Sequence, residues 1–105
     1  SLLNEKTNNF FASITRIGTL YGLAVLDLTT ADFRVIEFEK ESDLLNELYR
    51  IRPSEILTAK RFKDKHDSLF NEMKLAYEYL LSEQEDWRFD HQSTYNFLVS
   101  HFHVH

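Results

Sequence analysis

The sequence predicts an α/β fold in which a mixed five-stranded sheet has flanking helices. Two apolar runs on either side of a short polar connection, at residues 29–32, indicate a β-hairpin. Apolar residues then recur at helical spacing as far as Pro53, where the helix must end. A short apolar strand from Glu55 to Ala59 follows at once, which is typical of the tight connections in α/β proteins.

Three strands are expected to come first and to form an antiparallel meander. The first spans Phe10 to Ile17 and ends at Gly18-Thr19, a pair suited to a tight turn. The second begins at Tyr21. The third, Phe33 to Phe38, largely alternates apolar with polar side chains, as a half-buried strand does.

The first helix is predicted to start at Ser42, whose hydroxyl suits an N-cap, with Asp43 in the first turn. Arg50 and Arg52 complement the negative end of the helix dipole. One side of this helix is apolar and is expected to pack on the sheet. That side consists of Leu44, Leu45, Leu48 and Ile51.

The segment after the fourth strand is ambiguous. Its basic cluster, Lys60 to Lys65, contains an acid and is expected to be a solvated loop that leads into a helix. From His66 to Leu81 the periodicity slightly favours one long helix, but alternation from Leu75 onward also fits a strand. A last helix is expected to begin near Asp90. Its inner face would consist of Thr94, Tyr95, Leu98 and Phe102.

Composition limits the possible functions. The 105 residues are 43% hydrophobic, which suffices for one domain with a core, and there is no cysteine for a disulfide or a thiolate metal site. No apolar run approaches the roughly 18 residues of a membrane span, so a cytoplasmic location without membrane contact is expected. With 17 acidic and 12 basic side chains, the domain has no surplus of cations for strong nucleic-acid binding. This charge balance favours a domain that contacts other proteins.

Several short segments, in their order and spacing, carry a family resemblance. They are Asn8–Ile14, Tyr21–Phe38, Leu48–Leu57, Trp87–Asp90 and His101-Phe102. Together they resemble the connector domain, the second domain, of the MutS family of DNA mismatch-repair ATPases. The resemblance implies that residues 1–105 are a single domain of a longer bacterial protein, between its mismatch-binding and core domains. It also implies a part in transmitting ATP-dependent rearrangements, with the ATPase site in another domain, and contact with MutL.

The resemblance also favours a helix from about Lys65 to Lys74 followed by a strand from about Ala76 to Leu81, over one continued helix. The element order then becomes β-β-β-α-β-α-β-α, which is the ribonuclease-H-like arrangement. One departure from the family lies in the turn before the third strand, where members usually have glycine and this chain has Ala31. We expect Asp32 to adopt the left-handed conformation there, because aspartate tolerates it better than most residues.

A ribonuclease-H-like fold raises the hypothesis of a nuclease, which would need carboxylates at strand ends to hold two Mg²⁺ ions. The first strand has no acid, and none follows the fourth strand at a usable distance. Asp27 and Glu47 lie in the wrong elements. Because burying an unpaired carboxylate is costly, Asp27 is expected near its strand end, solvated or bonded to Thr29 or Thr30.

No catalytic residue, cofactor or metal site is predicted. Gly18 and Gly22 are too few for a phosphate-binding loop. His101, His103 and His105 would share one face only on a strand, whereas a helix is expected there and would separate them.

The candidate protein-contact residues are Asn96 and Phe97, because the MutL contacts of the family fall near these positions. Phe97 lies off the apolar stripe of the last helix, so its ring is expected to be exposed, as at interfaces. An alternative is that Phe97 packs against a neighbouring loop or domain. An alternative for the whole chain is a small α/β protein-interaction module unrelated to repair.

Overall fold

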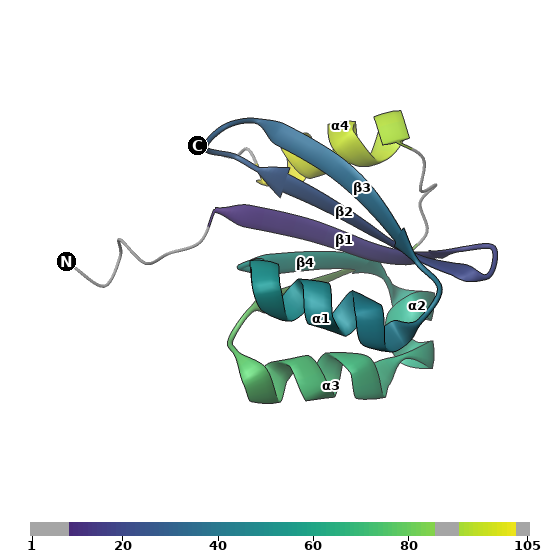
Figure 1. Cartoon of the computed structure of the whole chain (residues 1–105). Coiled ribbons are helices and arrows are strands. Elements are labelled where there is room, and N and C mark those ends of the chain that lie inside the picture. Colours follow the sequence, from purple (N-terminus) through teal and green to yellow (C-terminus); the bar gives the residue numbers. More distant parts are fainter. Residues whose placement is uncertain (1–8, 86–90, 103–105) are drawn as a thin grey trace.

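Five strands form one mixed sheet with helices on both faces in the computed structural model, which describes residues 9–85 and 91–102 (Figure 1). In chain order the elements are β1 (Phe10–Ile17), β2 (Leu20–Asp27), β3 (Asp32–Phe38), α1 (Glu41–Ile51), β4 (Glu55–Ala59), α2 (Lys60–Lys65), α3 (Asp67–Ala76), β5 (Leu80–Gln84) and α4 (His91–Phe102). The predicted α/β class and the mixed five-stranded sheet are therefore confirmed.

The strand order across the sheet is β3-β2-β1-β4-β5, so the first strand lies at the centre. The pairs β1–β2 and β2–β3 are antiparallel, which confirms the predicted meander. The pairs β1–β4 and β4–β5 are parallel. Parallel neighbours need a crossover connection, and α1 and the α2–α3 segment supply the two crossovers.

The two faces of the sheet are covered unequally. On the first face, α1 and α3 lie side by side beneath the strands with α2 at one end, whereas on the second face α4 is the one helix of residues 9–85 and 91–102 (Figure 1). The first face holds the larger apolar cluster, in which Ile14, Leu23 and Ile56 of the sheet meet Leu48 of α1 and Met73 of α3. The cluster on the second face has four buried members, which are Ala24, Leu26, Leu57 and Leu98.

The basic cluster after β4 is a helix, not the solvated loop that was predicted. Its one large apolar residue, Phe62, is 6% exposed and belongs to the first-face cluster. Lys60 and Asp64 form an ion pair with a 3.0 Å N–O distance at the i,i+4 spacing that favours a helix. Burial of a single aromatic ring therefore anchors a helix too short to be recognised from periodicity.

The fifth strand comes four residues later than predicted. α3 continues to Ala76, and residues 77–79 form an extended connection before β5. The Tyr77 hydroxyl donates to the carbonyl of Pro53 at 2.9 Å, and the Tyr79 hydroxyl donates to that of Phe70 at 2.8 Å. The two tyrosines that suggested strand alternation thus hold the connection in place, and β5 pairs with β4 from Leu80 onward.

Two local predictions about the backbone were wrong. α1 begins at Glu41 after Lys40, which supplies no side-chain cap, so Ser42 lies within the first turn. In the turn between β2 and β3, Ala31 and not Asp32 has the left-handed conformation, with φ of 65°. The Ala31 amide donates to the carbonyl of Asp27 at 2.7 Å, so the closure of the turn imposes this conformation.

The expectation for Asp27 is confirmed. It is the last residue of β2 and is partly exposed. Its Oδ1 accepts a hydrogen bond of 2.9 Å from the backbone amide of Thr29. The carboxylate therefore shapes the turn, because an aspartate that bonds to the backbone two residues later favours chain reversal.

Candidate functional site

The predicted contact surface lies on α4, which packs across β1 and β2. Thr94 and Leu98 are fully buried and Tyr95 is half-buried, so these three residues form the inner face as predicted. The rings of Tyr95 and Phe33 meet edge to face, with centroids 5.2 Å apart, which ties the helix to the edge strand β3. The side chain of Phe102 lies outside the described residues.

Phe97 is half-buried and packs against the second-face cluster, so the prediction of an exposed ring was wrong. The physical reason is that a helix lying on a sheet buries a wide stripe, which reaches positions adjacent to its central row. Asn96 is exposed, and its Oδ1 accepts a hydrogen bond of 3.2 Å from the side-chain amide of Gln92. The structure therefore leaves a polar group and part of an aromatic ring at this surface.

The core beneath α4 contains two buried hydroxyls, those of Ser13 and Thr94. Neither has a hydrogen-bond partner among the described residues. Ser13 lies opposite Ala24 of β2 and therefore faces α4. On the first face, in contrast, the Thr58 hydroxyl donates to the carbonyl of Ile14 at 2.8 Å.

The structure brings neither Asp27 nor Glu47 to the place where a nuclease of this topology would hold metal, the carboxyl ends of β1 and β4. Because β2 is antiparallel to β1, Asp27 lies opposite Phe10, at the far end of β1. Glu47 pairs with Arg50 at 2.5 Å and with Arg34 at 3.8 Å. The hydrogen bond from Arg50 lowers the pKa of Glu47. Within residues 9–85 and 91–102, no group of three acidic, histidine or cysteine side chains is arranged to hold a metal ion.

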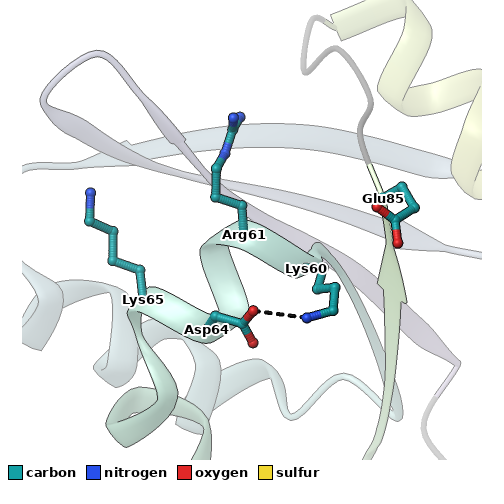
Figure 2. Close-up of a pocket in the computed structure, with 5 residues that line it drawn as sticks. All are labelled: Lys60, Arg61, Asp64, Lys65 and Glu85. Atoms are coloured by element: carbon teal, nitrogen blue, oxygen red, sulfur yellow. Dashed lines mark hydrogen bonds and ion pairs between the residues drawn. The ribbon is translucent and has the colours of Figure 1, made fainter.

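The carboxyl ends of β1 and β4 instead border a basic hollow that the sequence analysis did not predict. One part, a cavity of about 160 Å³, is lined by residues of β1, β4 and α2, among them Arg16 and Phe62, and by His66 directly after α2. Arg61 and Lys65 line this part and also a wider, open part that Lys60, Asp64 and Glu85 border (Figure 2). The signal in the sequence was a basic run placed directly after a buried strand.

Two further observations bear on the predictions. The side chains of His101, His103 and His105 lie outside the described part of the chain. Among the helices of the described part, none is both long and apolar enough to cross a membrane.

Comparison with known proteins identifies relatives along the whole domain. Residues 9–105 match the family described as MutS domain II. The chain is 53% identical over 104 residues to the DNA mismatch repair protein MutS of Protochlamydia amoebophila, which covers 99% of this chain and 12% of that protein. The corresponding protein of Chlamydia abortus is 41% identical over 104 residues, covering 99% and 13%.

The similarity extends beyond these two organisms. The DNA mismatch repair protein MutS of Lachnoclostridium phytofermentans is 33% identical over 103 residues, which cover 97% of this chain and 11% of that protein. The chain therefore spans between 11% and 13% of the length of these relatives. These matches disfavour an interaction module unrelated to repair.

Proposed function

Because this chain belongs to the MutS domain II family, we propose that it is the connector domain of a MutS-type DNA mismatch-repair protein. The observation that carries the proposal is the family match over residues 9–105, together with relatives named for mismatch repair. In this role the chain, a single domain over residues 1–105, links the mismatch-binding domain to the core domain of its parent. It works in the cytoplasm of a bacterium.

The contribution of the domain is mechanical and not catalytic. It transmits the ATP-dependent rearrangement of the parent protein, whose ATPase site lies outside these residues, and it uses no cofactor of its own. A packed sheet with helices on both faces supports this role, because such a body moves as a unit. The net charge of −5 supports a domain that contacts other protein domains and not DNA directly.

We assign the fold to the ribonuclease-H-like class. The strand order β3-β2-β1-β4-β5, with three antiparallel strands followed by two parallel ones, supports this assignment. Fold does not imply function. The positions of Asp27 and Glu47, away from the carboxyl ends of β1 and β4, argue against a nuclease.

We further propose that Asn96 and Phe97 of α4 contact MutL. Asn96 is exposed and Phe97, the next residue, is half-buried, so this part of α4 carries a polar and an aromatic residue in sequence. Aromatic residues flanked by polar ones are enriched at protein interfaces.

Binding between the complete parent protein and MutL from the same organism tests the contact. Asn96→Arg places a charged, bulky side chain at an exposed position without removing core volume, so it should weaken MutL binding about tenfold or more. Phe97→Ala should weaken it as well, although this substitution also removes packing. Ser100→Ala, on an exposed part of the same helix, is the control.

Surface plasmon resonance with immobilised MutL, in the presence of mismatched DNA and ATP, measures the affinity of each of the three variants for MutL. Thermal melting of each variant separates loss of the contact from loss of the fold. Unchanged MutL binding by folded Asn96→Arg and Phe97→Ala would refute the contact, while leaving the assignment to the connector domain untouched.

A further inference from the structure

We propose that the basic hollow at the carboxyl ends of β1 and β4 binds an extended, acidic segment of a protein. This second surface is separate from α4 and goes beyond the proposed function. Four basic side chains line the hollow against two acidic ones, in a chain whose net charge is −5. They are Arg16, Lys60, Arg61 and Lys65, against Asp64 and Glu85.

The position of the hollow in the sheet favours a binding site. From the central strand β1 the chain turns to β2 on one side, whereas the parallel neighbour β4 lies on the other. The hollow thus lies at the carboxyl ends of two adjacent parallel strands, the edge at which open α/β sheets bind ligands. Thr15 and Arg16 of β1 and Ala59 of β4 all line the hollow there.

The arrangement of the cations favours an extended ligand over a single compact anion. Arg61 and Lys65 are four residues apart on α2, and Figure 2 shows their side chains extending in the same general direction without converging on one point. Asp64 points instead toward Lys60, with which it forms the 3.0 Å ion pair. Two cations side by side match two carboxylates spaced along a peptide.

The floor of the hollow favours a peptide over a nucleic acid. The partly exposed His66 ring lies 4.3 Å from the buried Phe62 ring between centroids, and its outer side gives the methylene groups of glutamate an aromatic surface to pack against. Arg16 lies over the Tyr21 ring, 4.4 Å from its centroid, which holds the guanidinium in place. A nucleic acid would extend beyond the hollow, where its phosphates would meet the rest of a chain whose net charge is −5.

Fluorescence anisotropy with the 105-residue chain and a labelled peptide of about 12 glutamates tests the proposal. A labelled thymidine oligonucleotide of the same length, at the same low salt, is the second probe. Lys65→Glu should raise the Kd for the peptide by about three- to fivefold, because it replaces an attraction between exposed charges with a repulsion. Lys74→Glu changes the net charge equally at an exposed position beside Ser54, at the amino end of β4, and should leave the Kd nearly unchanged.

Amide chemical shifts in NMR spectra locate the peptide. Shifts concentrated at residues 15–16 and 59–66, which disappear in Lys65→Glu, are the expected result, and the dispersed spectrum of that variant would show that it is folded. The proposal is overturned if Lys65→Glu and Lys74→Glu weaken binding equally, if the oligonucleotide binds more tightly than the peptide, or if the peptide shows no saturable binding at millimolar concentration.

Discussion

The two faces of the sheet are built differently. Three helices seal the first face, and large side chains such as Leu44, Leu48 and Met73 are completely buried there. Among the described residues, a single helix covers the second face, where four buried residues are packed against seven partly buried apolar ones. The second face therefore contributes less buried apolar surface, although it belongs to the same sheet.

The difference extends to polar groups. The buried Thr58 hydroxyl on the first face has a hydrogen-bond partner, whereas those of Ser13 and Thr94 beneath α4 have none in the described part of the chain. An unsatisfied buried hydroxyl costs stability. The comparison suggests that the first face supplies most of the stability, and that α4 is the element whose position a partner can most easily influence.

The largest expected effect tests the difference in packing. Leu48→Ala in α1 should lower the free energy of unfolding by about 3 kcal/mol, because it leaves a cavity that three helices hold open. Leu98→Ala should cost about 2 kcal/mol, since one helix can settle onto the sheet. Urea denaturation measures both, with Leu75→Ala, at a 90% exposed position, as the control. An equal loss of unfolding free energy in Leu48→Ala and Leu98→Ala would show that the two faces do not differ in packing.

Removing a buried hydroxyl should change the free energy of unfolding by a smaller amount, and in opposite directions on the two faces. Ser13→Ala should raise the free energy of unfolding by about 1 kcal/mol, because it removes an unpaired polar group. Thr58→Val should lower it by about 1 kcal/mol, because it removes the bond to the Ile14 carbonyl. Thermal melting of both variants provides the comparison. A loss of stability in Ser13→Ala would mean that this hydroxyl is satisfied in solution.

The turn between β2 and β3 belongs to neither face and provides a reference. Ala31→Gly should raise the free energy of unfolding by about 1 kcal/mol, because glycine adopts a φ of 65° without steric cost. Ala76→Gly, at the end of α3, should not stabilise, since glycine is a poor helix former. Chemical denaturation can resolve the two changes. A destabilising Ala31→Gly would contradict a strained turn.

The smallest expected effect concerns an ion pair on the first face. The hydrogen bond from Arg50 lowers the pKa of Glu47 below its ordinary value of 4.5, so the ionised form is stabilised by folding. This contribution is present above pH 4.5 and is lost as the pH falls through the lower pKa of the folded state. Glu47→Gln should therefore cost about 0.5 kcal/mol at neutral pH and nothing in strong acid. Urea titrations across this pH range check the expectation, and a difference independent of pH would contradict it.

Local patterns were sufficient for the first half of the fold. The meander, the helix ending before Pro53 and the strand Glu55–Ala59 were all predicted, because alternation and helical spacing persist there over many residues. The second half depends on distant contacts. Tyr77 and Tyr79 bond to carbonyl groups that lie elsewhere in the chain, and no local pattern encodes such bonds.

The candidate site was predicted only in part. The inner face of α4 followed from helical spacing, as Thr94 and Leu98 demonstrate. The burial of Phe97 depends on how the helix lies on the sheet, which spacing alone does not determine. The basic hollow combines Arg16 of β1 with Lys65 of α2, and only the parallel pairing of β1 with β4 brings them to one edge.

The central position of β1 has a consequence for how the domain bears force. A pull on the polypeptide just before Phe10 acts along β1, which is hydrogen-bonded to β2 on one side and to β4 on the other. Sliding this strand out requires both ladders to shear at the same time. Tension entering there is spread through the whole sheet, so the domain would behave as a stiff lever and not as an extensible tether.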